Sequence, residues 1–217
     1  DGHHRYETAL QYSVERSAAG APSDSDQPYN YVLAYLTNAE ENGLAILPTH
    51  RVLKKNSLPN VADLEKVLLR DFRLKRYARE ENKAFDMALL TEGIDRRIGC
   101  VLSGAGCHWL LTFDERLARR LNASDPVRAL DVTVLHDYIF ERLLGLTPQM
   151  QREKITYVSD DEAAVRAVDE GEADAAFLLN ATTFEQIRAV CSSGETMRQK
   201  STYFYPKLPT GLVFYPL

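Results

Sequence analysis

Residues 98–113 read IGCVLSGAGCHWLLTF, which is two apolar runs separated by a short turn sequence. The flanking runs, Ile98–Leu102 and Trp109–Phe113, have the length and apolar character of β-strands. The turn between them, Ser103-Gly104-Ala105-Gly106, contains the glycines that tight turns use where the backbone needs a positive φ. This stretch predicts a β-hairpin, and the rest of the fold can be built outward from it.

On the C-terminal side of the hairpin, helical and extended patterns alternate. A helix is expected from about Asp131 to Gly145, where Gly145 and the following Pro148 end it. Further on we expect a strand at Ile155–Val158, a helix opened by a capping box of Ser159 and Glu162, a strand at Ala175–Leu179, a second capping box of Thr182 and Glu185, and a last strand near Leu212–Tyr215.

On the N-terminal side, Tyr6, Leu10, Val14 and Ala18 recur at helical spacing before Gly20. We then expect a surface loop at 20–28, strands at Tyr31–Leu36 and Leu44–Leu47, a helix that Asn60 caps, a solvated helical face in the charged stretch Arg70–Lys83, and a weaker helix at Ala84–Leu90. Helices and strands interleave without a regular repeat, which predicts an α+β fold with a mixed β-sheet and helices packed on it.

The organisation of the chain is predicted from its first residues. Residues 1–217 are expected to form a single α+β unit. Because the chain opens with Asp1 inside a loop-to-helix junction, we expect it to be the later part of a longer protein. The helix within 1–19 is expected to belong with the preceding part, and residues 29–217 to form the main body.

Composition excludes several classes of protein. With 45% hydrophobic and 26% charged residues, the chain is typical of a folded domain and not of a disordered tail, a collagen-like rod or a coiled coil. No apolar run approaches the ~18 residues of a membrane span. A net charge of −5 disfavours general binding to nucleic acid. Three cysteines make no disulfide framework, and we expect a reducing, cytoplasmic location.

The first residues, Asp1-Gly2-His3-His4-Arg5, predict an anion site. A glycine allows close approach of a ligand to the backbone, and the free N–H groups of a helix N-terminus favour an anion. Two histidines and an arginine at that end are unfavourable unless something negative binds them, and phosphate is the obvious candidate. The alternative is that Asp1 caps the helix and the histidines are solvated. A metal is not expected, because adjacent histidines project about 100° apart on a helix and no zinc spacing is present.

A second cluster, residues 197–214 (MRQKSTYFYPKLPTGLVF), combines basic and hydroxyl side chains. In this cluster Lys200 and Lys207 are candidate phosphate ligands, and Ser201, Thr202 and Tyr203 are candidate pocket residues. The alternative is an aromatic ribbon at a sheet edge whose lysines stay in water.

A third segment, Leu47-Pro48-Thr49-His50-Arg51, follows an expected strand. His50 and Arg51 at the end of a strand are well placed to line a pocket. A salt-bridged surface corner explains them equally well. Cys100 lies in an apolar run and is interpreted as a core residue, not as a nucleophile.

The segments DGHHRYETA, LPTHR and MRQKSTYFYPKLPTGLVF, together with LDVTVLHDYIFERLLG and EGEADAAFLLNAT, resemble the bacterial and archaeal family called domain of unknown function 1015. The resemblance extends over essentially the whole chain. The family implies kinship and no established activity.

A shorter resemblance concerns Gly2-His3-His4-Arg5-Tyr6, which is similar to the G-C-H-R-Y element of sulfiredoxin and to the corresponding turn in ParB-like proteins and free serine kinases. This resemblance implies that Gly2, His4 and Arg5 contact nucleotide phosphate. His3 stands where sulfiredoxin has its reactive cysteine, which removes sulfiredoxin chemistry and leaves phosphoryl transfer open.

The leading hypothesis is therefore a protein that binds a nucleotide or phosphate, with small-molecule phosphotransfer from ATP or ADP as the activity if it is an enzyme. His3 or Asp1 would handle a proton, and Mg²⁺ would be held mainly by the nucleotide and by Asp1. The competing hypothesis is a non-enzymatic regulatory or scaffold module that binds an anionic metabolite or partner. DNA binding, suggested only by the ParB analogy, ranks third. The oligomeric state cannot be read from the sequence.

Overall fold

The computed structural model describes residues 2–20, 26–38, 43–58, 61–81, 85, 86, 88, 89, 96–209 and 211–215. The chain divides into two compact units: unit 1 comprises Asp1–Ala45 and Phe204–Leu217, and unit 2 comprises Ile46–Tyr203. In unit 1, Ser13 donates a hydrogen bond to Asn30 (2.7 Å) and Arg16 lies 5.9 Å from the ring centre of Tyr29, so that residues 28–30 group with the first helix.

Unit 1 contains the helix α1 (His3–Ala18) and the 3-10 helix η1 (Pro28–Asn30). The predicted helix is confirmed, but its apolar stripe of Tyr6, Leu10 and Val14 is exposed within this unit. The predicted loop at 20–28 falls largely on residues outside the described ranges.

Two strands predicted in unit 1 are wrong. Residues 31–36 have no regular secondary structure and their side chains are exposed, and residues 212–215 likewise form no strand. Apolar residues suggested strands in both places, but a strand also needs a partner for its backbone groups. The strand predicted at 44–47 is confirmed as β1 (Ala45–Leu47). This strand does have a partner, β8 (Tyr203–Tyr205), with which it forms a two-stranded sheet.

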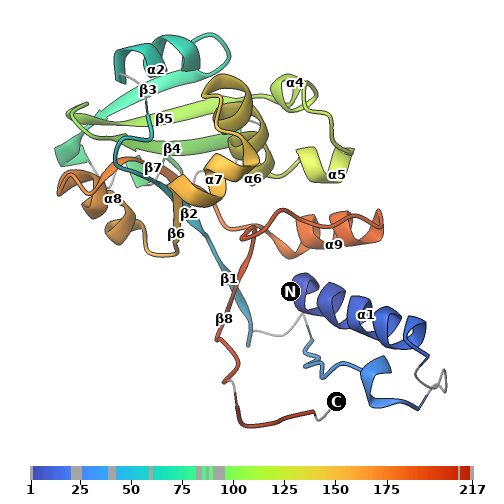
Figure 1. Cartoon of the computed structure of the whole chain (residues 1–217). Coiled ribbons are helices and arrows are strands. Elements are labelled where there is room, and N and C mark those ends of the chain that lie inside the picture. The colour runs from blue at the N-terminus through green and yellow to red at the C-terminus, as the bar shows by residue number, and fades with distance from the viewer. Residues whose placement is uncertain are drawn as a thin grey trace. The chain divides into compact units, whose positions relative to one another are not determined.

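Unit 2 is built on a six-stranded sheet with the order β3-β5-β4-β7-β2-β6, in which neighbouring strands run antiparallel. Its strands are β2 (His50–Lys54), β3 (Arg73–Ala78), β4 (Arg96–Leu102), β5 (Cys107–Phe113), β6 (Ile155–Val158) and β7 (Ala173–Leu178). The hairpin predicted at 98–113 is β4 and β5. With helices packed on the sheet, the predicted α+β class is confirmed (Figure 1).

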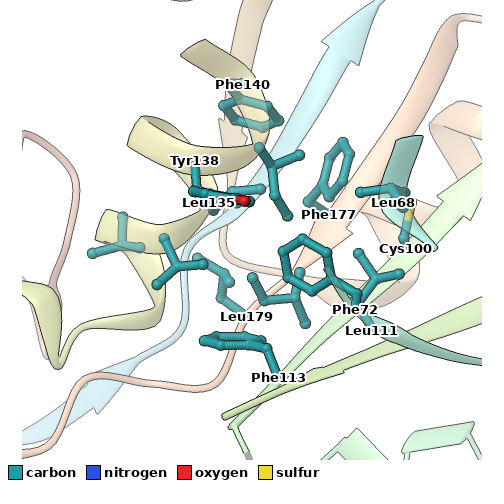
Figure 2. Close-up of a cluster of buried hydrophobic side chains, with 14 of the residues drawn as sticks. Leu68, Phe72, Cys100, Leu111, Phe113, Leu135, Tyr138, Phe140, Phe177 and Leu179 are labelled. Atoms are coloured by element: carbon teal, nitrogen blue, oxygen red, sulfur yellow. The ribbon is translucent and has the colours of Figure 1, made fainter. Parts of the chain in front are cut away.

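The helices of unit 2 cover both faces of the sheet. They are α2 (Val61–Leu68), η2 (Arg79–Glu81), α4 (Glu115–Ala118), α5 (Asp125–Arg128), α6 (Asp131–Thr133), η3 (Val134–Leu143), α7 (Pro148–Lys154), α8 (Asp161–Asp169) and α9 (Phe184–Ser192). One core cluster joins α2, η3 and α9 to the sheet, and a second joins α8 to the opposite face. Figure 2 shows the first cluster, in which the ring of Phe140 of η3 packs against that of Phe177 of β7 (ring centres 5.1 Å apart) and the ring of Tyr138 packs against that of Phe72 (6.2 Å).

The helix predicted from Asp131 to Gly145 has an unexpected form. After the short α6, residues 134–143 form a π-helix, in which Leu144 N–H donates to the carbonyl of Ile139 (3.0 Å). It ends at Gly145, whose φ of 66° lies in the left-handed region that glycine accepts without strain. A π-helix turns its side chains differently from an α-helix, and such segments are frequent at functional sites.

The charged stretch Arg70–Lys83 was wrongly predicted as a helical face. Residues 73–78 form β3, which is an edge strand of the sheet and pairs with β5. An edge strand exposes much of its length, and basic side chains there discourage pairing with other chains. The caps of α8 and α9 lie one residue further on than predicted: Asp160 caps α8 by accepting from Ala163 N–H, and Thr183 with Gln186 forms the capping box of α9.

Close packing around Gly99 on β4 generates a test of this core. A Cβ at that position would lie 2.9 Å from Cζ of Phe85 and 3.1 Å from Cβ of Leu178. Overpacking of this kind typically costs about 1–3 kcal/mol. Gly99→Ala is therefore expected to lower the free energy of unfolding by that amount in urea denaturation. Gly43→Ala, at a site with open space around it, is the control and should change it by less than about 0.5 kcal/mol; equal effects would contradict the packing.

Candidate anion-binding site

A small cavity of about 160 Å³ lies in unit 2 where several segments converge. The start of β2, the beginning of α6, the segment that follows β7, the N-terminus of α9 and the loop before β8 all contribute to its wall. Its lining residues are Thr49, Arg51, Asp131, Val132, Leu179, Asn180, Ala181, Thr182, Thr183, Gln186 and Ser201. Most of these carry groups that can form hydrogen bonds, so the cavity is suited to a polar ligand.

Arg51 is the most unusual of these residues, because its side chain is only 1% exposed. Its Nε donates to Nε2 of His136 (3.1 Å), its Nη1 donates to the carbonyl of Thr49, and its Nη2 donates to the carbonyl of Lys200 (2.8 Å). A guanidinium has five N–H donors, so these three bonds leave two for another partner.

The hydrogen bonds around His136 fix its tautomer. Nδ1 of His136 lies 2.7 Å from Oε1 of Gln151, and the amide group of Gln151 is oriented by its donation to the carbonyl of Leu146 (2.8 Å). Nδ1 therefore carries the proton, and Nε2 is free to accept from Arg51. Burial and the charge of Arg51 lower the pKa of His136 to about 3, so this ring is neutral at physiological pH.

The charge of Arg51 is not balanced by a carboxylate. Among the residues that the structure describes, its acceptors are two carbonyl groups and a neutral imidazole, and its nearest aromatic partner is Tyr157, whose ring centre lies 5.4 Å away. Burial lowers the pKa of Arg51 to about 10, which still leaves it protonated near neutral pH. A buried charge without a counter-ion is costly, and an anion in the cavity would relieve that cost.

The N-terminus of α9 adds to the positive potential. Thr183 and Gln186, which line the cavity, form the capping box at the start of this helix. The aligned peptide dipoles place a partial positive charge at this end, which stabilises anions nearby. Arg51 and the helix end therefore favour the same type of ligand.

The loop before β8 is held in place by several bonds. Arg198 forms an ion pair with Asp137 of η3, Ser201 donates to the carbonyl of Arg198 (2.6 Å), and Thr182 donates to the carbonyl of Ser201 (2.9 Å). This loop supplies the Lys200 carbonyl that binds Arg51, with Lys200 at a φ of 59°. The contact of Lys200 with Arg51 is thus made by its backbone, and its side chain is exposed.

The predicted pocket residues do not all meet at the cavity. Arg51 and Ser201 line it, whereas His50, Thr202 and Tyr203 are not part of its wall. His50 is the residue before Arg51 on β2, so its side chain points to the opposite face of the sheet. There it accepts a hydrogen bond from Leu179 N–H at Nδ1 (3.2 Å), and burial lowers its pKa. The burial of both side chains does not fit a salt-bridged surface corner.

The residues of the DGHHR motif lie in unit 1, at the start of α1. Gly2 has a φ of 85°, and a Cβ there would lie 2.9 Å from a terminal nitrogen of Arg5, so the guanidinium folds back over the glycine. The rings of His3 and His4 lie 4.1 Å apart, and His4 faces Glu7 at 3.5 Å. His4 and Arg5 are exposed within this unit, and Asp1 is outside the described residues. Phosphate binding by Gly2, His4 and Arg5 stays a prediction, as do the proton-transfer roles of Asp1 and His3.

Lys207 also lies in unit 1, on an exposed segment after β8. A role for the side chains of Lys200 and Lys207 in binding phosphate likewise stays a prediction. Cys100, in contrast, is fully buried in the first core cluster, and burial raises the pKa of its thiol, as its interpretation as a core residue requires.

Sequence reasoning missed His136, Gln151 and Asp131 as parts of the site. A signal for His136 was present, because Val132, His136 and Phe140 recur every four residues and are all buried. A polar residue on an otherwise apolar helical face needs a buried partner, and Arg51 is that partner.

Two kinds of feature, a metal-binding cluster and a membrane-spanning helix, are absent from the described ranges. No group of three or more His, Cys, Asp or Glu side chains there is arranged to hold a metal ion. No helix in those ranges is long and apolar enough to cross a membrane.

The chain belongs to the family of proteins of unknown function called DUF1015, whose model matches residues 1–133. This match confirms the family expected from the sequence. It includes Arg51 and Asp131 and ends before His136, Gln151 and Ser201. A search of curated proteins finds no match.

Several solved structures resemble the fold. They include a conserved hypothetical protein from Pyrococcus furiosus (14% identity, TM-score 0.46, 81% of this chain and 62% of that chain), free serine kinase in complex with AMP (15%, 0.47, 94% and 65%) and a variant of free serine kinase in complex with ADP (16%, 0.47, 94% and 65%). The chain thus spans less than two thirds of the length of these proteins.

The lowered pKa of His136 predicts a pH dependence of stability. The imidazole of an unfolded chain titrates near 6.5, so between about pH 6.5 and 3 the unfolded state binds a proton that the folded state does not. The free energy of unfolding should therefore fall as the pH falls through this window, by up to about 1.4 kcal/mol per pH unit from this residue.

His136→Gln should make that slope shallower in urea denaturation at a series of pH values. His50 and His108, whose pKa values burial also lowers, contribute a background of the same sign in both proteins. Gln11→Ala, which alters an exposed side chain on α1 that has no titratable group, is the control and should leave the slope unchanged. An unaltered slope in His136→Gln would contradict a neutral His136 in the folded state.

Proposed function

We propose that this chain binds a small molecule through a phosphate group that Arg51 holds in the cavity of unit 2. The observation that supports this proposal is the burial of the Arg51 guanidinium without a carboxylate partner among the described residues, at the wall of a polar cavity. Guanidinium groups bind phosphate through two parallel N–H bonds, and Arg51 has two N–H groups left for such a pair.

The size of the cavity limits what it can hold. A cavity of about 150 Å³ accommodates a six-carbon ring, so one of about 160 Å³ holds a phosphate with a few attached atoms. Whole drug-sized ligands occupy roughly 300–1,000 Å³. If the ligand is a nucleotide, the cavity therefore binds one phosphate of it and not the whole molecule.

Phosphotransfer from ATP or ADP is the enzymatic form of this proposal. Phosphoryl transfer depends mainly on positioning and on neutralisation of charge, and Arg51 supplies the second. Mg²⁺ would be held mainly by the nucleotide. The cluster of Gly2, His4 and Arg5 in unit 1 is the second proposed phosphate-binding group.

A non-enzymatic binding module is the competing function, and one observation favours it. Two hydroxyl groups at the cavity wall, those of Thr182 and Ser201, donate to backbone carbonyls. Among the described residues, neither is hydrogen-bonded to a side chain that can accept its proton, as an activated nucleophile would be. Ligand-induced thermal stabilisation without turnover on Mg²⁺, ATP and a panel of metabolites would support this form.

The binding proposal is tested by isothermal titration of the full chain with inorganic phosphate, AMP, ADP and ATP. Removing a hydrogen-bonded charge from a buried site costs about 1.5–3 kcal/mol, which is roughly 10- to 100-fold in affinity. We expect Arg51→Gln to weaken binding by at least this factor. Arg51→Lys should recover only part of it, because an ammonium cannot form the paired bonds.

Two further variants complete the experiment. Arg5→Ala measures the contribution of the cluster in unit 1 separately. Arg116→Gln alters an arginine side chain that is 92% exposed on α4 and should leave binding unchanged. Absence of binding by every probe, or full affinity in a folded Arg51→Gln protein, would overturn the proposal.

A further inference from the structure

The cavity contains a second charged group that the binding of an anion does not explain. Asp131, the first residue of α6, lines the same cavity of about 160 Å³ as Arg51. The two side chains do not pair with each other: among the described residues the partners of Arg51 are neutral, and Asp131 forms its ion pair with Arg96.

The ion pair of Asp131 uses one of its two carboxylate oxygens. Arg96 Nε donates to Oδ1 of Asp131 (2.7 Å), while Nη1 of Arg96 donates to the carbonyl of Arg128 (2.9 Å). The remaining Nη2 of Arg96 is buried and makes no hydrogen bond to a described residue. The pair is thus single and not the two-bond form, and the side chain of Asp131 keeps 21% exposure at the cavity wall.

One acceptor at the cavity wall lacks a donor. Oδ1 of Asn180 is buried and without a partner in the described parts of the chain, and Asn180 lines the cavity together with Asp131. Burial raises the pKa of Asp131 despite the opposing effect of Arg96. Buried acceptors are nearly always satisfied, so a ligand that supplies donors would complete this site.

We infer that Asp131 selects ligands that carry, a few atoms from the anionic group, an ammonium or hydroxyl group that donates to its carboxylate. The ligand then bridges Arg51 and Asp131 across the cavity. This inference rests on the proposed binding of phosphate by Arg51 and adds the second half of the ligand. A simple phosphate ester without a donor satisfies Arg51 alone.

The test uses three phosphate esters of nearly equal size: 2-aminoethyl phosphate, 2-hydroxyethyl phosphate and propyl phosphate. They differ only in the terminal group, which is an ammonium, a hydroxyl or a methyl. In isothermal titration of the full chain we expect affinity to decrease in that order. The ammonium ester should bind at least about 10-fold more tightly than the propyl ester, because a hydrogen bond to a charged group is one of the stronger polar contacts.

Asp131→Asn provides a readout that a merely structural role would not change. Asparagine keeps the shape of the side chain and removes its charge, so the preference for the ammonium ester should fall below about 3-fold while the propyl ester binds at least as well as before. Asp125→Asn, at a side chain that is 82% exposed on α5, is the matched control and should keep the full preference.

The outcomes separate this inference from the proposed function. If no ester binds and inorganic phosphate does not bind, the proposed function fails. If the three esters bind with equal affinity, or if the preference survives in Asp131→Asn, the role of Asp131 is overturned while phosphate binding by Arg51 stands. Should Asp131→Asn fail to fold, the ratio of affinities in the unaltered protein decides alone.

Discussion

The buried guanidinium of Arg51 is the constraint on which the proposed site depends. A positive charge at 1% exposure requires either a counter-ion or a ligand, and the described residues offer it two carbonyls and an imidazole. Each of these acceptors satisfies a hydrogen bond without neutralising the charge. The cavity beside Arg51 then has a physical reason to attract an anion.

The fold builds this arrangement from a strand that is buried on both faces. β2 lies between β7 and β6 in the sheet. Because successive side chains of a strand point to opposite faces, those of β2 point alternately to the two core clusters. Arg51 points to the face that η3 covers, where His136 accepts its Nε proton, and His50 points to the other face. Gln151 completes this arrangement. Its amide oxygen accepts from Nδ1 of His136 and so fixes the tautomer whose Nε2 can accept from Arg51.

Local patterns of sequence predicted the elements that depend on local chemistry. The turn at residues 103–106 and the apolar runs beside it are the hairpin β4–β5, and the alternation after Ile155 is β6, α8 and β7. The failures have a common cause in long-range pairing. Basic residues in β3 read as a solvated helix because nothing local shows that Arg73–Ala78 pairs with β5. The apolar run at 31–36 read as a strand although it has no partner strand.

The site was predictable only in part, for the same reason. The LPTHR segment indicated Arg51, and the hydroxyl-rich segment near Lys200 indicated Ser201. What brings them together is not local: Arg51 bonds to His136, 85 residues away, and to the carbonyl of Lys200, 149 residues away. Asp131 was predicted only as the beginning of a helix, and nothing local shows that it lines the same cavity as Arg51.

The most direct test of the account is a crystal structure of the chain grown with inorganic phosphate. The account predicts electron density for phosphate within hydrogen-bonding distance of the Arg51 guanidinium, in the cavity lined by Thr49 and Ser201. A cavity that contains only water while phosphate occupies a different site would contradict it.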